Sequence, residues 1–490
     1  MDAIGLSATD SDGNPLTIRE ARDSYNVSHT ITKKLGEGGQ GLVCMTENPE
    51  IVLKFILDGA GRVISRDKDK ESFQRNLKKI KGILSKPFPD RLHLAFPMAH
   101  LADFSGYVMR MMRDMEPFKN LQSIVSFPKT GGHRRRFELL SKLASVLAHI
   151  HGYGMVYCDI SPNNVFVSAS PEIKTQNVWL IDADNIFVPG FDDNRLVYTP
   201  RYAAPELFEN TPCSQNSDCY SFAILAFECL AAVHPFEGAK ATNWEDESDD
   251  WDKSVSTQQS VAEPTSEIDP RYSGKYPWIE DPDDESNHTE NGLPRQFFLS
   301  EETFTLFNLT FTIGKAEPER RPRMVFWARA FARSADCSVE CRQCQMSFVH
   351  DGEMNACPWC DGELTPRLVL KDNGRVVFVR ELDSHGSNWI EFPERLFSPF
   401  DIQTSWNTLL ECRREKEDGL IIEFKIPSTA DIGGHSFYLS SSTGWKAKIK
   451  GQYSLELKEK ESYSLEYENT GTGQTRILKL EIIGGQQHEN

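Results

Sequence analysis

The spacing of hydrophobic and polar residues divides the chain into two parts of different character. In the first part, short apolar runs alternate with longer segments whose apolar residues recur at helical spacing, which predicts strands mixed with helices. The clearest elements are two strands, an amphipathic helix and a helix that is apolar on every side and therefore buried: residues 31–35, 51–56, 137–147 and 217–228. From about Arg367 onward apolar and polar residues alternate, as in strands with one buried face.

Four of these alternating segments predict an antiparallel β-sandwich or a small barrel in the C-terminal part: residues 422–426, 453–457, 463–467 and 478–482. Short turns join the later segments, which is typical of antiparallel neighbours. The region shows no group of catalytic side chains, so recognition or packing is its expected role. A forkhead-associated-like sandwich that binds phosphothreonine is one alternative. The chain as a whole is therefore expected to be α+β.

The length of 490 residues predicts two or three domains, because single hydrophobic cores stop growing well below this size. The net charge is −18, from 54 basic and 72 acidic residues, so no general affinity for nucleic acid is expected. Most of the excess lies in residues 239–290, which hold 15 acidic and 4 basic residues. We interpret this acidic insert as a solvated, partly disordered loop, and its tryptophans at 244, 251 and 278 leave a docking site open.

No apolar run is long enough to span a bilayer, and the N-terminus lacks the basic and apolar regions of a signal peptide. We therefore expect a cytosolic location without a membrane partner. The 11 cysteines agree with this location, because their arrangement favours metal binding and free thiols over a disulfide framework.

Two cysteine pairs predict a metal site. Cys341 and Cys344 form one C-x2-C pair, and Cys357 and Cys360 form a second pair after twelve intervening residues. Two such knuckles present four thiolates in a tetrahedron, which predicts structural zinc. A rubredoxin-like iron site uses the same ligands, and redox dithiols are a further alternative. Four protein ligands leave no open position, so catalysis at this metal is not expected.

A glycine-rich turn follows the first predicted strand. Gly36, Gly38, Gly41 and Val43 fit the spacing G-x-G-x-x-G-x-V, in which glycines let backbone amides approach phosphates and the valine covers an adenine ring. A dinucleotide-binding turn of similar spacing would lead into a helix. Here a second strand follows instead, and it carries Lys54 in an otherwise apolar run. The lysine must be paired if it is buried, unless it points to solvent from an edge strand.

Residues 151–167 predict a catalytic loop between the amphipathic helix and a short strand. Asp159 lies five residues before Asn164, so the carboxylate can accept a hydroxyl proton while the amide holds a divalent metal. A later apolar strand, residues 178–181, ends directly in Asp182, a second candidate magnesium ligand. These features are the apparatus of phosphoryl transfer.

The motifs, in this order, resemble those of eukaryotic-type serine/threonine protein kinases. The loop resembles H-R-D-x-x-x-x-N, Asp182 stands where D-F-G begins, and residues 199–206 resemble the T-P-x-Y-x-A-P-E end of an activation segment. The resemblance implies that Asp218 supports the catalytic loop through backbone hydrogen bonds, and that Arg321 forms a salt bridge with Glu206.

In such a fold Mg-ATP, or Mn-ATP, lies between two lobes with the glycine turn over the phosphates. Lys54 would hold the α- and β-phosphates and pair with Glu71, seventeen residues further on. Asn164 and Asp182 would hold the metal ion. Asp159 would accept the proton of a serine or threonine hydroxyl on a protein substrate.

The resemblance also implies a domain order. A bilobal kinase-like domain would include the acidic insert and be followed by a four-cysteine zinc ribbon and a β-sandwich-like domain: residues 1–27 (extension), 28–333, 334–366 and 367–490. A kinase domain followed directly by a cysteine ribbon is similar to a bacterial subgroup found in stress or defence clusters. The partners implied by that subgroup are a von Willebrand A-type protein and a metal-dependent phosphatase.

Three positions depart from the family pattern. Cys158 replaces the arginine that clamps a phosphorylated activation segment in the family, so the resemblance implies a kinase of the non-RD type without such switching. Ser161 replaces a lysine that touches the γ-phosphate, which removes a positive charge from the transition state. Tyr157 replaces a structural histidine. The alternatives to an active protein kinase are a nucleotide-binding pseudokinase scaffold and a kinase fold that transfers AMP.

Overall fold

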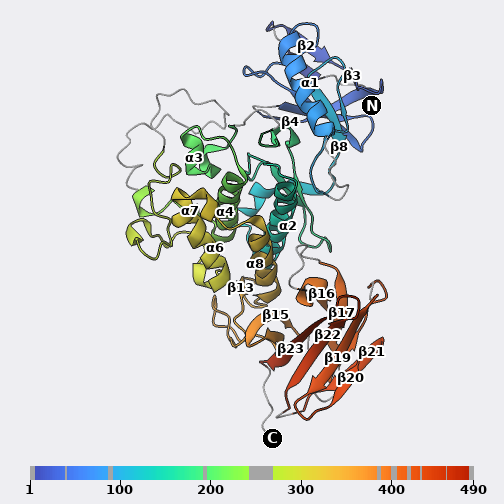
Figure 1. The fold of residues 1–490 in the computed structure, drawn as a ribbon, viewed down its shortest axis with the longest axis vertical. Helices are drawn as coiled ribbons and strands as arrows, with labels where there is room; N and C mark the ends of the chain where they lie inside the picture. The colour runs from blue at the N-terminus through green and yellow to red at the C-terminus, as the bar shows by residue number, and fades with distance from the viewer. Residues whose placement is uncertain are drawn as a thin grey trace.

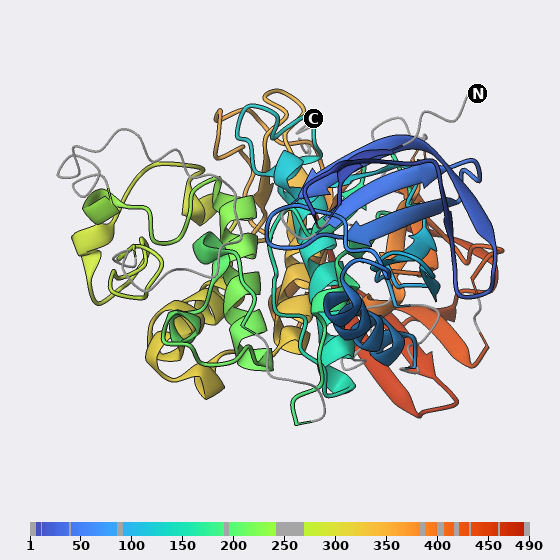
Figure 2. The same cartoon turned by 90° about the horizontal axis from the view of Figure 1, so that it is seen from above.

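Three parts follow one another down the long axis of the molecule in the computed structural model (Figure 1): an N-lobe, a helical C-lobe and a C-terminal β domain. Seen from above, the blue N-lobe lies over the teal part of the C-lobe, and the yellow-green helices extend to the other side (Figure 2). The structure describes residues 6–10, 12–38, 41–85, 92–190, 196–241, 269–382, 388–398, 406–415, 421–430, 433–458 and 461–484.

The N-lobe is built on a six-stranded antiparallel sheet. Its strands, in spatial order, are β3 (Glu20–Arg22), β4 (Ser28–Gly38), β5 (Gly41–Thr46), β6 (Ile51–Ile56), β8 (Gly106–Arg110) and β7 (Ala99–His100). Helix α1 (Lys70–Leu84) begins after Asp69, whose side chain caps it by accepting from the Ser72 N–H. The helix packs on β6 and β8 because Ile80 shares a buried cluster with Val52 and Tyr107.

The described part of the expected N-terminal extension also packs into this lobe. β1 (Leu6–Thr9) and β2 (Pro15–Ile18) form an antiparallel hairpin, and β3 pairs directly with β4. Leu6 and Ile18 are buried in the same cluster as Ile31 of β4. The residues before the glycine turn thus contribute both strands and core to the N-lobe.

The C-lobe surrounds a central helix, α4, whose side chains from Ser217 to Ala231 are all buried. This confirms the prediction of an interior helix. Its first turn is closed by a capping box between Ser214 and Ser217. The other helices are α2 (Gly132–Gly152), α3 (Pro205–Phe208), α6 (Glu301–Phe311), α7 (Ile313–Ala316) and α8 (Met324–Cys337), with α4 itself at Gln215–Ala231. A small antiparallel sheet has the order β11 (Val178–Leu180), β10 (Val165–Ser168), β9 (Met115–Pro117).

The described end of the acidic insert, residues 269–290, packs against the C-lobe. Trp278 is 0% exposed and contacts Phe227 of α4 and Phe311 of α6, with ring centroids 5.7 and 5.5 Å away. Asn287 is also buried and donates to the Phe236 and Pro277 carbonyls. The solvated-loop interpretation is therefore wrong for this end of the insert. Residues 242–268, which include the other two tryptophans, lie outside the described residues.

A short hairpin and two facing sheets follow α8. The hairpin is β12 (Ser338–Glu340) with β13 (Ser347–Val349). One antiparallel sheet has the order β15 (Arg375–Glu381), β14 (Arg367–Asp372), β23 (Gln474–Ile483), β22 (Tyr463–Asn469), β19 (His435–Ser441), β20 (Lys446–Lys448). The other has the order β16 (Ile390–Pro393), β17 (Thr408–Arg414), β18 (Ile421–Lys425), β21 (Gln452–Glu456). The predicted antiparallel C-terminal sheets are confirmed, and side chains of both share one buried cluster.

The hairpin is held between the C-lobe and the first sheet. Val339 and Phe348 of the hairpin share a buried cluster with Val369 of β14 and Val379 of β15. On the other side, the Ser347 Oγ accepts from the His133 N–H at the start of α2, at 2.6 Å. Among the described residues, no helix has the length and apolar character needed to cross a bilayer.

Candidate active site and metal centre

The catalytic loop is held from below by Asp218 at the start of α4. Its buried carboxylate accepts from the backbone N–H groups of Tyr157 and Cys158, at 2.8 and 2.9 Å, and lies 2.9 Å from His151 Nε2. Cys158 has φ 78°, a left-handed conformation that non-glycine residues rarely adopt. The hydrogen bonds from the loop to Asp218 offset the cost of that conformation, and the role predicted for this aspartate is confirmed.

Asp159 is the next residue in the loop, and it is buried. Its Oδ1 accepts from the Thr199 hydroxyl at 2.8 Å, and its Oδ2 accepts from the Asn164 amide at 2.9 Å. Burial raises the pKa of the Asp159 carboxyl, and the hydrogen bonds from Thr199 and Asn164 oppose this shift. The loop thus binds the start of the 199–206 motif directly to its own carboxylate.

Asp182 lies beside this pair at the end of β11. The backbone N–H of Ile181 donates to the Asn164 carbonyl at 3.0 Å, which joins the strand end to the loop. Asp182 has φ 57°, and its Oδ1 lies 2.8 Å from the Nζ of Lys54. The structure therefore brings together four predicted residues from both lobes: Lys54, Asp159, Asn164 and Asp182.

The glycine turn adjoins the lysine. β4 and β5 pair so that Gly36 lies opposite Val43 and Gly38 opposite Gly41, and Val43 in turn lies opposite Lys54 on β6. A Cβ atom on Gly41 would lie 2.9 Å from the Lys54 Cε and 2.9 Å from the Phe55 carbonyl oxygen, closer than real Cβ atoms come. Only glycine fits at this position. Gly39 and Gln40, at the tip of the turn, lie outside the described residues.

The structure contradicts the predicted ion pair between Lys54 and Glu71. Glu71 is in the first turn of α1, its side chain is 88% exposed, and it pairs with Arg75 at 3.0 Å. The buried face of α1 is formed by Phe73, Ile80 and Ile83. Since Glu71 precedes Phe73 by two residues, it points to nearly the opposite side of the helix. The number of residues between Lys54 and Glu71 suited the predicted ion pair, but Glu71 lies on the exposed face of α1.

The end of the 199–206 motif is anchored to the C-lobe by two sets of contacts. Arg321 forms the predicted salt bridge with Glu206, at 2.7 and 2.8 Å through its two terminal guanidinium nitrogens. The second set was not predicted: Arg201 lies 2.7 Å from Glu228 of α4, which also accepts from the Tyr202 hydroxyl. Glu228 near the end of the mainly apolar helix α4 is the sequence signal that could have revealed this second set, because a buried carboxylate needs a partner.

The three departures from the family pattern are all inside the loop. The Tyr157 hydroxyl donates to the Ile181 carbonyl, so the tyrosine still joins the loop to the strand that ends in Asp182. The Cys158 thiol donates to the Asn185 carbonyl at 3.4 Å. Ser161 is buried in the position expected for a lysine.

The four predicted cysteines form the metal centre. The Sγ atoms of Cys341, Cys344, Cys357 and Cys360 all lie within 4.8 Å of one another, which is the grouping that a metal ion requires. The residue after each pair has a left-handed backbone, Gln345 at φ 60° and Asp361 at φ 54°, so the two knuckles have matching turns. No other group of three or more such ligands is found in the described part of the chain.

A two-lobed fold that gathers a lysine, two aspartates and an asparagine beneath a glycine turn defines a phosphotransferase of the kinase type. The comparison with known families agrees, because the protein kinase domain matches residues 29–273, half of the chain. The chain therefore belongs to the protein kinase family.

Individual relatives are distant. Ribosomal protein S6 kinase 2 beta of Xenopus laevis is 26% identical over 238 residues, which cover 46% of this chain and 35% of the relative. Ribosomal protein S6 kinase alpha-3 of Homo sapiens is 27% identical over 232 residues, 45% of this chain and 29% of the relative. A putative ribosomal protein S6 kinase alpha-1 of Caenorhabditis elegans is 27% identical over 218 residues, 42% and 26%. The chain thus spans about a third or less of these curated relatives.

Proposed function

We propose that the protein is a serine/threonine protein kinase that transfers the γ-phosphate of ATP to a hydroxyl of a protein substrate. One observation carries the proposal: the loop that holds Asp159 and Asn164 is joined to the strand end at Asp182, and Asp182 pairs with Lys54 where the two lobes meet. The similarity to the ribosomal protein S6 kinases supports a serine or threonine acceptor. The hydrogen bond from Thr199 to Asp159 also supports it, since this motif resembles that of serine/threonine kinases.

The residues between the lobes fit magnesium and ATP. Asn164 uses its amide nitrogen to donate to Asp159, which leaves the amide oxygen as a ligand atom, and its backbone carbonyl accepts from the Ile181 N–H, directly before Asp182. Two oxygen donors of this kind suit Mg²⁺, which prefers hard ligands. The lack of room for a side chain at Gly41, beside Lys54, supports the proposal that the turn approaches phosphates through its backbone. The bound metal and nucleotide would supply charge neutralisation and the phosphoryl group.

Asp159 is the proposed general base for the substrate hydroxyl. It is buried, and two hydrogen bonds fix its carboxylate in one orientation. Lys54 would neutralise phosphate charge, and Asp182, in place of the predicted Glu71, supplies the negative partner that a buried lysine needs. Catalysis of this kind is mainly positioning and charge neutralisation.

The wider setting is also part of the proposal. The four-cysteine group is proposed to bind structural zinc, because four convergent thiolates leave no open ligand position. The kinase is proposed to be of the non-RD type, with Cys158 in the arginine position and no phosphate clamp there. A cytosolic role in bacterial signalling, stress or defence, beside a von Willebrand A-type protein and a metal-dependent phosphatase, is proposed because a kinase domain followed by a cysteine ribbon resembles a bacterial subgroup with those partners.

The test is transfer of labelled phosphate from ATP labelled at the γ or the α position. We expect γ-label on serine or threonine, shown by phosphoamino acid analysis, and a loss of about 10²- to 10⁴-fold in Asp159→Asn. Asp103→Asn, which changes an exposed aspartate paired with Arg22, is the matched control and keeps wild-type transfer. Transfer of α-label would replace this proposal with AMP transfer. Absence of both labels would leave a nucleotide-binding scaffold.

A further inference from the structure

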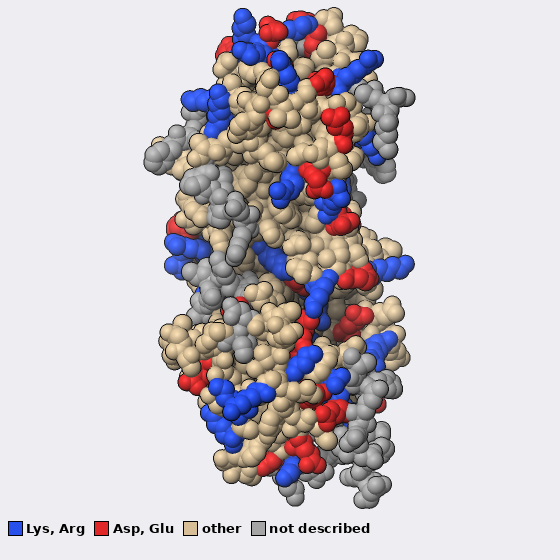
Figure 3. All heavy atoms as spheres, turned by 90° about the vertical axis from the view of Figure 1, so that its right-hand side faces the viewer, with Lys and Arg blue, Asp and Glu red and all other residues tan. Residues whose placement is uncertain are grey.

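A cavity of about 490 Å³ lies where the C-lobe, the hairpin of β12 and β13 and the C-terminal β domain meet. Its wall includes Arg134 and Arg135 at the start of α2, Glu340 of β12, Arg367 of β14 and Arg380 of β15. The surface is hollowed at this level of the molecule, and charged side chains gather there (Figure 3). The volume is within the range of small-molecule sites.

Two arginines on one side of the junction share a single carboxylate. Arg395 lies 2.6 Å from Asp336 Oδ1 through Nη2 and 2.9 Å from Oδ2 through Nε. Arg380 lies 3.3 Å from the same Oδ1 and also donates to the Asp336 backbone carbonyl at 2.6 Å. All three side chains are largely buried, with exposed fractions of 13% for Arg380, 8% for Arg395 and 4% for Asp336. Asp336 is therefore a negative partner that Arg380 and Arg395 share.

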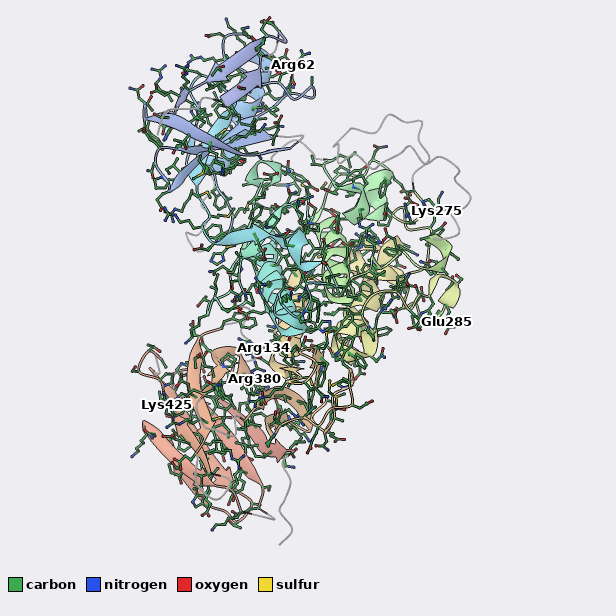
Figure 4. The ribbon with its side chains drawn as sticks, turned by 180° about the vertical axis from the view of Figure 1, so that it is seen from behind. Arg62, Arg134, Lys275, Glu285, Arg380 and Lys425 are labelled. Atoms are coloured by element: carbon green, nitrogen blue, oxygen red, sulfur yellow. The ribbon has the colours of Figure 1, made fainter. Side chains whose placement is uncertain are left out.

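Arg134 adds a third positive charge to this group. Figure 4 shows Arg134 and Arg380 next to one another at the junction. Burial, and then the positive charge of Arg134, lower the pKa of Arg380 to about 9, while Asp336 opposes the shift. Arg134 forms no hydrogen bond or salt bridge with any residue that the structure describes. Its guanidinium is thus available to a ligand.

A further buried cation lies on the same wall. Arg367 is 2% exposed and donates from Nη2 to the Met354 carbonyl, but its Nε has no acceptor among the described residues. A buried donor without a partner is costly. Two of the acids on the wall are already paired, Glu138 with Lys142 at 2.7 Å and Glu381 with Arg342 at 2.6 Å. Glu172, Glu340 and Glu363 also line the cavity but form no salt bridge among the described residues.

We propose that this cavity is a binding site for a small phosphate-bearing molecule, held by Arg134 together with Arg380 and Arg367. Guanidinium groups present paired N–H donors whose spacing matches phosphate oxygens, and they remain charged in partly buried sites. Arg134 lies seventeen residues before His151 on α2, so the site is roughly 25 Å along the helix from the catalytic loop. It is distinct from the proposed ATP site and does not depend on the proposed catalytic function.

The consequence of binding would be a link between domains. The ligand would contact the first turn of α2, whose last turn leads into the catalytic loop, and strands of the C-terminal domain at the same time. Phosphate would also relieve the repulsion among the three arginines around Asp336. The C-terminal domain would thereby be fixed against the C-lobe.

The test is calorimetric titration of the full chain with inorganic pyrophosphate and, separately, with a phosphoserine peptide. We expect pyrophosphate to bind at one site, and Arg134→Ala to weaken this binding at least tenfold. Arg134→Lys keeps the charge but loses the paired donors, so an intermediate loss is expected. Arg375→Ala is the matched control, because Arg375 lies on the same strand as Arg380 but pairs outside the cavity with Glu302.

Far-ultraviolet circular dichroism of each variant verifies folding, and Arg134 is suited to this test because its side chain is exposed and its removal leaves the core intact. Pyrophosphate affinity that is equal in Arg134→Ala and wild type would overturn the proposal, as would the absence of pyrophosphate binding. Binding of the phosphoserine peptide without binding of pyrophosphate would overturn the small-molecule assignment and indicate a phosphorylated protein segment.

Discussion

Replacing Asp218 by asparagine removes one acceptor from the buried centre of the catalytic loop. The wild-type carboxylate accepts from Tyr157 N–H and Cys158 N–H and contacts His151. Asparagine has the same shape but only one acceptor oxygen, so its NH₂ group must face one of these two N–H donors. Because the position is 0% exposed, water cannot replace the lost acceptor.

The magnitude follows from these contacts. A buried donor left without an acceptor costs about 1–3 kcal/mol, and hydrogen bonds to a charged acceptor contribute about 1.5–3 kcal/mol each. We therefore expect the free energy of unfolding of the C-lobe to fall by about 2–4 kcal/mol. Activity should fall further, because Cys158 at φ 78° immediately precedes Asp159 and small displacements of a catalytic group cost about 10²-fold.

The assay combines urea unfolding, followed by tryptophan fluorescence, with γ-phosphate transfer measured without denaturant. Asp103→Asn is again the control, since this aspartate is exposed and pairs with exposed Arg22. An Asp218→Asn protein that stays within about 0.5 kcal/mol of wild type, with an unchanged transfer rate, would refute the view that this carboxylate supports the loop.

Three further predictions concern the anchoring of the same lobe and the metal centre that follows it. Arg321→Met leaves the Glu206 carboxylate without its bidentate partner, so the free energy of unfolding should fall by about 3–5 kcal/mol. Adding Glu206→Gln in a double-mutant cycle should restore part of the lost stability. Losses that simply add in the double variant would contradict the coupling between the two residues. We expect one zinc ion per wild-type chain by atomic absorption, and Cys357→Ser should reduce this content and lower the unfolding temperature. A variant that keeps the wild-type zinc content would exclude the four-cysteine group as the zinc site. Burial and the nearby charge of Arg201 lower the pKa of His234 from 6.5 to about 4. Between these two pH values the unfolded chain therefore binds more protons than the folded chain. The free energy of unfolding should fall by about 3 kcal/mol as the pH drops through this range. His234→Asn should flatten that pH dependence in urea titrations, and an equally steep slope would contradict the assignment.

Much of the candidate catalytic site could be predicted because its parts are short continuous motifs. Asp159 and Asn164 lie on one tight loop, and the hydrogen bond between their side chains is a local consequence of five-residue spacing. The support from Asp218 and the Arg321 pair with Glu206 could be predicted only through the resemblance to the protein kinase motifs. Glu71 could not be placed in this way, since its distance from Lys54 in the sequence says nothing of the helical face on which it lies.

The amino-acid sequence by itself determined the elements and the local chemistry: a glycine-rich turn, a loop with a carboxylate and an amide, two thiolate knuckles, and strands with one apolar face. These depend on residues close to one another in the chain. Only the tertiary structure decided which distant charges meet. Lys54 pairs with Asp182 from the other lobe, and Arg134, Arg380 and Arg395 gather around one carboxylate from three separate segments. Such contacts depend on how whole surfaces pack, and packing is a sum over many weak apolar contacts that no short pattern of residues specifies.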